Sequence, residues 1–170
     1  MCGAYGERYE EFPMTDFSTL YKKYAPDVFR FALYLSGDRG QAEDITSETF
    51  VRAWTSRERI EVATVKAYLF TIARNLFLQG LRRKSRPVQL DRELPDPQAS
   101  PYLQAEQKEE FRAVLRGLEE LPEIDRAALL MRAQDGMAYE EISRILGISL
   151  SSAKVKIHRA RLVLAGIRHA

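Results

Sequence analysis

The sequence contains very little of the chemistry that disulfides and metal sites require. It has one cysteine, Cys2, and two histidines, His158 and His169. A single cysteine cannot form an intramolecular disulfide, and no Cys/His cluster has the spacing of metal ligands. We therefore expect no metal site and no cofactor.

Long apolar runs are missing as well. No stretch approaches the roughly 20 apolar residues that a membrane-spanning helix needs, and the N-terminus has no basic segment followed by an apolar stretch, as a secretion signal would. We expect a cytoplasmic protein without membrane insertion. Nor does the sequence hold a nucleophile–base pair or a phosphate-binding glycine loop. The expectation is a protein that is not an enzyme and has no small-molecule substrate.

Acidic residues are absent from the last part of the chain. None follows Glu141, whereas this stretch contains Arg144, Lys154, Lys156, Arg159, Arg161 and Arg168. A second basic cluster covers residues 82–86. Because the net charge is only +2, this distribution says more than the total, and it indicates two contacts with a polyanion. Solvated helix ends remain an alternative, since cations near helix C-termini are favourable in any case.

Apolar residues recur at spacings of three and four through most of the chain, which predicts helices. In the first half the predicted helices cover residues 16–35, 41–54 and 65–83. Pro26 could divide the first of them into two. Residues 1–15 show no period and are predicted to form a flexible tail.

The composition changes between the two halves. The segment between Arg86 and Tyr102 contains four prolines (Pro87, Pro95, Pro97 and Pro101) and three acids (Asp91, Glu93 and Asp96). Such a segment buries too little apolar surface to offset the entropy of ordering, so it is predicted to be an extended linker over residues 87–104. The chain is thus predicted to be all-α, with two small helical domains at residues 16–86 and 105–170 joined by a flexible Pro-rich acidic linker.

The strongest local pattern runs from Tyr139 to Leu164. A short amphipathic helix leads to Gly147, which suits the left-handed conformation of a sharp turn, and Ser149 is placed to cap the next helix. This is the pattern of a helix-turn-helix, whose second helix enters the major groove of DNA. Its outward positions predict DNA contacts at Ser151, Ser152, Lys154, Val155, Lys156, His158 and Arg159. An ordinary helical hairpin with a basic side is the alternative.

With these residues in view, the sequence resembles the extracytoplasmic-function (ECF) sigma factors of the sigma-70 family. Residues 121–123, 139–142, 146–149, Lys154 and residues 158–161 resemble sigma region 4. Residues 42–45, 48–50 and 52–54 resemble the polymerase-binding part of sigma region 2, and residues 67–76 resemble its promoter-binding part. The resemblance covers roughly residues 17–164 in the family's order. Ala138 departs from it, because relatives often place a Ser or Thr cap there, and Val155 stands where a small polar residue is common.

The resemblance implies roles for both domains. Region 4 would read the minus-thirty-five element of a promoter, and region 2 would read the minus-ten element and hold it open. The third predicted helix, over residues 65–83, has Lys and Arg side chains together with the aromatic rings of Tyr68 and Phe70. This combination suits single-stranded DNA, because bases stack on rings while cations bind phosphates. Core packing is an equal alternative for Tyr68. The candidate minus-ten residues are Arg57, Arg59, Lys66, Tyr68, Arg74, Asn75, Arg82 and Arg83.

A polar stripe on the second helix is the candidate polymerase-binding face. It consists of Gln41, Asp44, Glu48 and Arg52. Without the resemblance, a solvated helix face with an intrahelical Glu48–Arg52 pair would be the preferred interpretation. The resemblance implies three partners, namely core RNA polymerase, promoter DNA and an anti-sigma factor. A conventional helix-turn-helix regulator that does not associate with core polymerase remains the alternative function.

Overall fold

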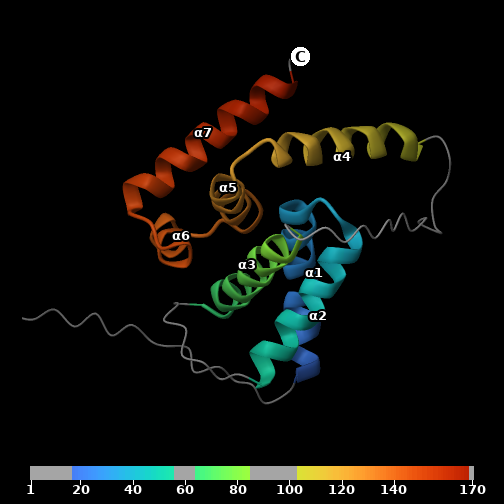
Figure 1. The fold of residues 1–170 in the computed structure, drawn as a ribbon, viewed down its shortest axis with the longest axis vertical. Helices are drawn as coiled ribbons and strands as arrows, with labels where there is room; N and C mark the ends of the chain where they lie inside the picture. Colours follow the sequence, from blue (N-terminus) through green and yellow to red (C-terminus); the bar gives the residue numbers. More distant parts are fainter. Residues whose placement is uncertain (1–16, 56–63, 85–102, 169–170) are drawn as a thin grey trace, which may run out of the picture.

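The computed structural model describes residues 17–55, 64–84 and 103–168. Within these ranges the regular structure consists of helices alone, so the all-α prediction is confirmed (Figure 1). The helices are α1 (Phe17–Ser36), α2 (Arg39–Thr55), α3 (Val65–Lys84), α4 (Leu103–Glu119), α5 (Glu123–Asp135), α6 (Tyr139–Leu146) and α7 (Leu150–Arg168). None of these helices is long and apolar enough to cross a membrane.

The first helix is continuous through Pro26, although the sequence left open a division into two helices. A proline inside a helix lacks one N–H donor and disturbs the preceding turn. Here the following turns hold α1 in place, because Val28, Phe31, Ala32 and Leu35 are all buried. Packing against the neighbouring helices therefore outweighs the local cost of the proline.

Side-chain caps mark the starts of α2 and α3. Both helices begin within about two residues of their predicted first residues. The Gln41 N–H donates to Asp38 Oδ1 at 2.7 Å, and the Ala67 N–H donates to Thr64 Oγ1 at 3.1 Å. Each cap satisfies one of the backbone donors that the first turn of a helix leaves free.

Helices α1, α2 and α3 pack together and form what we call the N-terminal half (Figure 1). Its core includes Phe31 of α1 and Phe70 of α3, whose rings stack with centroids 4.5 Å apart and planes 8° apart. Both side chains are fully buried. Aromatic stacking between α1 and α3 thus joins two helices that are separated in the sequence by α2.

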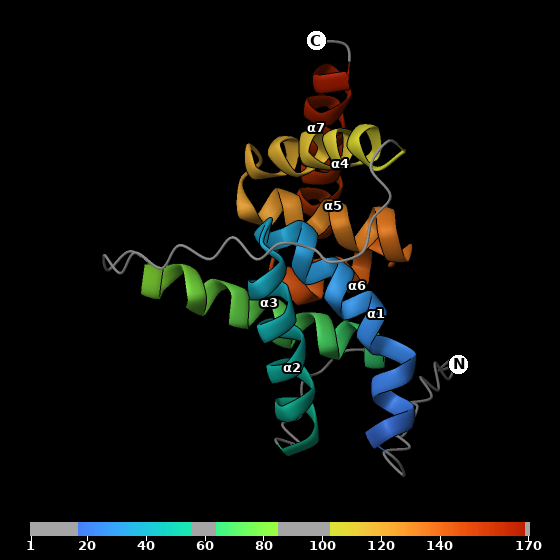
Figure 2. The ribbon, with the colours of Figure 1, turned by 90° about the vertical axis from the view of Figure 1, so that its right-hand side faces the viewer.

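Helices α4 to α7 form the C-terminal half, with α5 at its centre. Figure 2 shows α5 between the N-terminal half on one side and α4 and α7 on the other. Because α5 is covered on both sides, five consecutive apolar residues in its middle are buried, namely Ala127, Ala128, Leu129, Leu130 and Met131. Helix α4 begins at Leu103, two residues before the predicted start of the second domain at residue 105.

The two halves pack directly against each other, which the sequence did not predict. The rings of Tyr34 on α1 and Phe111 on α4 meet edge to face with centroids 5.8 Å apart. The Arg126 guanidinium of α5 donates to the Leu35 carbonyl at the end of α1. The predicted tail (residues 1–15) and most of the predicted linker (residues 87–104) lie outside the described residues.

Candidate nucleic-acid and polymerase interfaces

The helix-turn-helix forms as its residues predict. Gly147 follows α6 with φ of 64°, in the left-handed region, and its N–H bonds back to the last turn of α6. Ser149 then caps α7, because its Oγ accepts the Ser152 N–H at 3.1 Å. The predicted turn and the predicted cap are both confirmed. By contrast, Ala138 at the start of α6 makes no side-chain cap.

These two caps give a matched pair of stability predictions. Ser149→Ala should lower the free energy of unfolding by about 1 kcal/mol, because it leaves a backbone donor of α7 without its partner. Ala138→Ser should raise it by up to about 1 kcal/mol, because it supplies the cap that α6 lacks. Chemical denaturation followed by circular dichroism measures both, and equal midpoints for the two variants would contradict this account of the motif.

One side of α7 is buried against the rest of the C-terminal half. Ala153, Ile157 and Ala160 are at most 1% exposed, so the opposite side of the helix faces solvent. Of the predicted DNA-binding residues, Ser151, Lys154, Val155, His158 and Arg159 are exposed, whereas Ser152 and Lys156 are half-buried. The Lys154 ammonium lies 5.7 Å from the centre of the Tyr139 ring, and Arg132 lies 4.5 Å from the same ring.

A buried carboxylate under α7 was missed by the sequence reasoning. Asp125, in the first turn of α5, is 2% exposed. One of its oxygens lies 3.2 Å from Lys156 Nζ and the other 3.3 Å from Arg159 Nε. Asp125 therefore joins α5 to α7 and fixes two cations of the candidate recognition helix. The sequence signal was an acid two residues before the apolar run at residues 127–131.

The candidate minus-ten residues fall into different environments. Arg57 and Arg59 lie outside the described residues, while Asn75, Arg82 and Arg83 are exposed on α3. Tyr68 is 6% exposed and Phe70 fully buried, so both rings lie in the core. The expectation of an aromatic surface at Phe70 was wrong, and for Tyr68 the structure agrees with the core alternative. The reason is that α3 contacts α1 and α2 as well as α6 of the C-terminal half.

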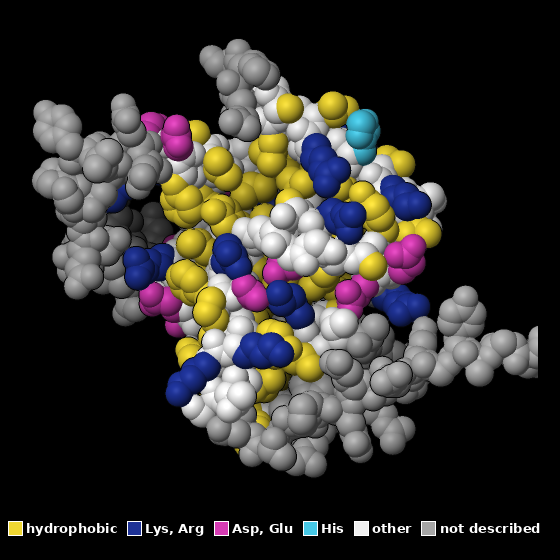
Figure 3. Space-filling model, turned by 180° about the vertical axis from the view of Figure 1, so that it is seen from behind, with side chains coloured by type: hydrophobic (Ala, Val, Ile, Leu, Met, Phe, Trp, Pro, Cys, Tyr) yellow, Lys and Arg dark blue, Asp and Glu magenta, His cyan; other side chains and the backbone are white. Residues whose placement is uncertain are grey.

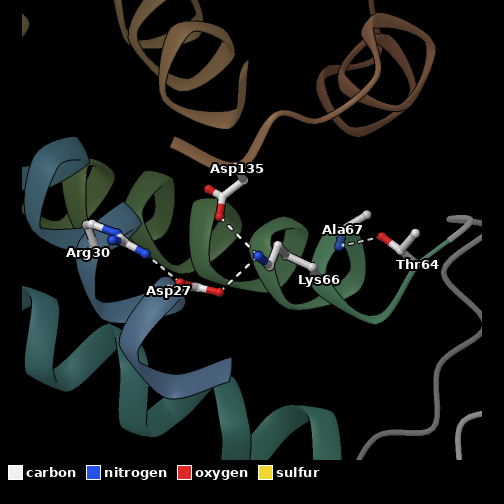
Figure 4. Close-up of polar contacts among 6 residues, drawn as sticks. All are labelled: Asp27, Arg30, Thr64, Lys66, Ala67 and Asp135. Carbon is white, nitrogen blue, oxygen red and sulfur yellow. Dashed lines mark hydrogen bonds and ion pairs between the residues drawn. The ribbon is translucent and has the colours of Figure 1, made fainter. Parts of the chain in front are cut away.

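Lys66 lies between two carboxylates from different halves (Figure 4). Its Nζ is 2.9 Å from Asp27 Oδ2 on α1 and 3.2 Å from Asp135 Oδ1 at the end of α5. Asp27 also pairs with Arg30 on its own helix. The Lys66 side chain is 30% exposed and that of Asp135 only 3%, so this cation contributes to the contact between the halves.

The pKa values in this cluster reflect burial and pairing together. Burial alone would lower the pKa of Lys66, but its hydrogen bonds to Asp27 and Asp135 and their charges raise it above the ordinary 10.5. The hydrogen bond from Lys66 lowers the pKa of Asp27 below 3.8 despite some burial. The stabilising effect of Lys66 is therefore present below pH 10.5 and lost as the pH rises through its raised pKa. That of Asp27 is present above pH 3.8 and lost as the pH falls through its lowered pKa.

Asp135 behaves in the opposite way. Its burial raises its pKa above 3.8, although Lys66 opposes this shift. The charged carboxylate is thus disfavoured where it lies, and its contribution to stability decreases as the pH rises through its raised pKa. Its second oxygen, Oδ2, is buried and has no hydrogen-bond partner.

Arg74 makes the second charged contact between α3 and α5. Its Nε and Nη2 donate to the two carboxylate oxygens of Glu123 at 2.7 and 2.9 Å. The Arg74 side chain is 13% exposed and that of Glu123 19%. Near the start of α3, Thr64 Oγ1 also donates to Glu141 Oε1 of α6 at 2.8 Å. Two candidate minus-ten cations, Lys66 and Arg74, are therefore covered by acids of the C-terminal half.

The candidate polymerase-binding stripe lies on α2. Asp44 and Glu48 are exposed, and Gln41 and Arg52 are half-buried. Arg52 Nε donates to Glu48 Oε1 at 2.8 Å, the intrahelical pair that the four-residue spacing predicts. This pair is compatible with both interpretations of the stripe, because exposed pairs at this spacing contribute only a few tenths of a kcal/mol.

Comparison with known proteins identifies the family to which this chain belongs. Residues 20–87 match the family model Sigma-70 region 2, and residues 111–164 match the model Sigma-70, region 4. The chain is 35% identical over 148 residues to the ECF RNA polymerase sigma factor SigM of Bacillus subtilis, covering 84% of this chain and 88% of that protein. It is 34% identical over 157 residues to the ECF RNA polymerase sigma factor SigE of Mycolicibacterium smegmatis, covering 87% of this chain and 60% of that longer protein.

Solved structures agree. The sigma factor RpoE, crystallised with the anti-sigma factor NepR from Bartonella quintana, matches with a TM-score of 0.71 at 25% identity, over 92% of this chain and 99% of that one. CnrH in complex with the cytosolic domain of CnrY shares the fold, with a TM-score of 0.67 at 23% identity over 90% of this chain and 87% of that one. The chain belongs to the sigma-70 family, among its ECF RNA polymerase sigma factors.

Proposed function

We propose that this sigma factor binds core RNA polymerase, carries it to promoters and opens the DNA there. The observation that carries the proposal is the capped helix-turn-helix, whose second helix exposes one side to solvent and lies in the part of the sequence after Glu141 that has no acids. We propose that residues 16–86 act as region 2, residues 87–104 as the linker and residues 105–170 as region 4.

In region 4, α7 would read the minus-thirty-five element. Lys154 is exposed near the N-terminal end of α7, the end that contacts base edges in this motif, and Val155 beside it is 59% exposed. Lys154 and Arg159 each suit a guanine edge, and Val155 suits a thymine methyl. Ser151, Ser152 and His158 suit backbone phosphates. Lys156, which pairs with the buried Asp125, is proposed to hold α7 in place as well as to contact phosphate.

In region 2, the cations and the amide of α3 would contact the minus-ten element. Lys66, Arg74, Asn75, Arg82 and Arg83 are the proposed residues, together with Arg57 and Arg59 in the preceding connection. Tyr68 is left out of this surface because its ring is buried. Lys66 and Arg74 must separate from the carboxylates with which they pair before they can reach DNA.

Gln41, Asp44, Glu48 and Arg52 are proposed to contact core polymerase. An exposed polar stripe beside a packed three-helix core can dock without disturbing that core. An anti-sigma factor is a further proposed partner, since sigma factors of the same fold were solved in complex with anti-sigma factors. We place the protein in the cytoplasm, where polymerase and DNA meet, and we assign phosphodiester synthesis to the polymerase rather than to this chain.

Charge reversals at exposed positions separate the two proposed contacts. Lys154→Glu should weaken binding to the minus-thirty-five element at least about tenfold while leaving the affinity for core polymerase unchanged, because a repulsive charge replaces a base contact. Asp44→Arg should weaken core binding about tenfold while leaving DNA binding by α7 unchanged. Fluorescence anisotropy with labelled promoter DNA and with core polymerase measures the two affinities.

Glu110→Lys is the matched control for these reversals. Glu110 is an exposed residue of α4 outside the proposed contact residues, so reversing its charge should leave core binding unchanged and should not weaken promoter binding. If Lys154→Glu and Asp44→Arg behaved like Glu110→Lys, the assignment of both faces would be wrong.

A further inference from the structure

A tyrosine at the start of α6 lies against cations from both neighbouring helices. Tyr139 is the first residue of α6, and its half-buried ring packs against the hydrophobic core. Arg132, in the last turn of α5, has its guanidinium carbon 4.5 Å from the centre of this ring, and Lys154 Nζ of α7 lies 5.7 Å from the same centre. One ring therefore connects the two helices that flank α6.

Arg132 is fixed in place independently of the ring. Its Nη1 donates to the Met137 carbonyl at 2.8 Å and to the Gly136 carbonyl at 3.4 Å. Gly136 has a φ of 62°, in the left-handed region, so these carbonyls belong to the sharp turn that leads from α5 into α6. The guanidinium thus holds this turn, and the Tyr139 ring that follows it, in a defined position relative to α5.

Lys154 is held differently from Lys156 and Arg159, the next two cations along α7. Both of these pair with the buried carboxylate of Asp125, which compensates part of their charge. Lys154 is exposed and makes no ion pair with any residue that the structure describes, and it lies over the Tyr139 ring instead. An aromatic ring attracts a cation through its quadrupole but has no net charge. The ring can therefore locate Lys154 while the full charge of the ammonium stays available to a polyanion.

The cations of α7 gather on one face of the molecule. Figure 3 shows Lys and Arg side chains around the histidine at the upper right, where α7 lies in that view, and the nearest Asp and Glu side chains lie below them. A lysine has a long side chain with many rotamers, and ordering it on binding costs entropy. Restricting the rotamers of Lys154 before DNA arrives reduces this cost.

We propose that Tyr139 is a positioning residue for promoter recognition, whose ring holds the Lys154 ammonium in the place from which it meets a base edge. The ring acts through Lys154 and not through a DNA contact of the tyrosine hydroxyl. This inference rests on the proposed function, because the assignment of Lys154 to the minus-thirty-five element comes from there. The geometry of ring and ammonium is a property of the free chain and can be tested without DNA.

Two substitutions separate the ring from the hydroxyl. The readout is how strongly the chain, in complex with core polymerase, prefers a promoter fragment selected by run-off transcription over the same fragment with a scrambled minus-thirty-five element. Tyr139→Phe keeps the ring and should change this preference less than about twofold. Tyr139→Leu keeps an apolar side chain without a π face and should reduce it about three- to fivefold, the range for a partly exposed cation–π contact.

Tyr24→Leu is the matched control. Tyr24 is half-buried on α1, and Lys23 Nζ lies 5.1 Å from the centre of its ring, so this substitution removes a contact of the same kind from the N-terminal half. It should leave the preference for the intact minus-thirty-five element unchanged. Circular dichroism on each variant checks that the helices remain folded at the temperature of the binding measurement.

Two further measurements connect the effect of the ring to Lys154. In a Lys154→Ala background, Tyr139→Leu should cause no additional loss of preference, because no ammonium is left to position. In the free chain, proton NMR should show the ε-methylene protons of Lys154 shifted upfield by the ring. This shift should persist in Tyr139→Phe and disappear in Tyr139→Leu.

The outcomes separate the positioning role from the proposed function. Equal losses in Tyr139→Phe and Tyr139→Leu would assign the effect to the hydroxyl, and no loss in either would leave the ring a packing role only, so both results would overturn the proposal. A Tyr139→Leu loss that persists in full without Lys154, or an unshifted Lys154 in the free chain, would overturn it as well. If the unaltered complex did not distinguish the two fragments while the NMR shift was present, the geometry would stand, but the proposed function would be refuted and the positioning role with it.

Discussion

Phe31→Ala should lower the free energy of unfolding by about 3–5 kcal/mol, the range for a large aromatic residue removed from a core. Phe31 is fully buried and stacks on Phe70 with ring centroids 4.5 Å apart. Truncation removes the stacking and leaves a cavity between α1 and α3. Because α3 would carry the minus-ten contacts, the loss of this packing should also abolish initiation at growth temperature.

Chemical denaturation followed by circular dichroism measures this effect. The matched control is Val51→Ala on α2, which shortens an apolar side chain that is 50% exposed. It should change the free energy of unfolding by less than about 0.5 kcal/mol. A loss at Phe31 as small as that at Val51 would mean that the α1–α3 interface is packed differently.

Asp125→Ala should cost about 2–3 kcal/mol of stability and should also disorder the candidate recognition helix. The carboxylate is 2% exposed and bridges Lys156 and Arg159. Removing one partner of a buried pair leaves the other charge without compensation. The cost is moderated here because the side chain of Arg159 is 59% exposed and can return to water.

The effect on DNA distinguishes positioning from stability alone. At a temperature where the variant is still folded, Asp125→Ala should weaken specific binding to the minus-thirty-five element more than non-specific DNA binding, because α7 loses its fixed orientation while keeping its charge. Asp125→Glu, which keeps the carboxylate, should restore part of the specificity. Equal losses in specific and non-specific binding would argue against a positioning role.

Local sequence patterns were sufficient to predict most of the helices and the turn between α6 and α7. Gly147 and Ser149 act within a few residues of themselves, so the turn and the cap could be predicted from their neighbours alone. The Glu48–Arg52 pair follows from the four-residue spacing of a helix in the same way. Helix boundaries were correct to about two residues where a capping side chain was present, as at Asp38 and Thr64.

The contact between the halves could not be predicted in this way. Lys66 and Asp135 are 69 residues apart, and Arg74 and Glu123 are 49 apart, distances that no helical period spans. The error at Phe70 has another cause, which is packing inside the N-terminal half. The Phe70 ring stacks on Phe31 of α1, and α3 is covered by neighbouring helices on more than one side, so a ring that was expected to be exposed is buried.

The central claim is that this chain gives core polymerase its promoter specificity. Run-off transcription from a library of promoter fragments, with bacterial core polymerase and the purified chain, tests it most directly. The account predicts initiation that depends on the chain and that drops with Asp44→Arg and with Lys154→Glu. Site-specific DNA binding without any effect on initiation or on core polymerase would contradict it and would favour a conventional helix-turn-helix regulator.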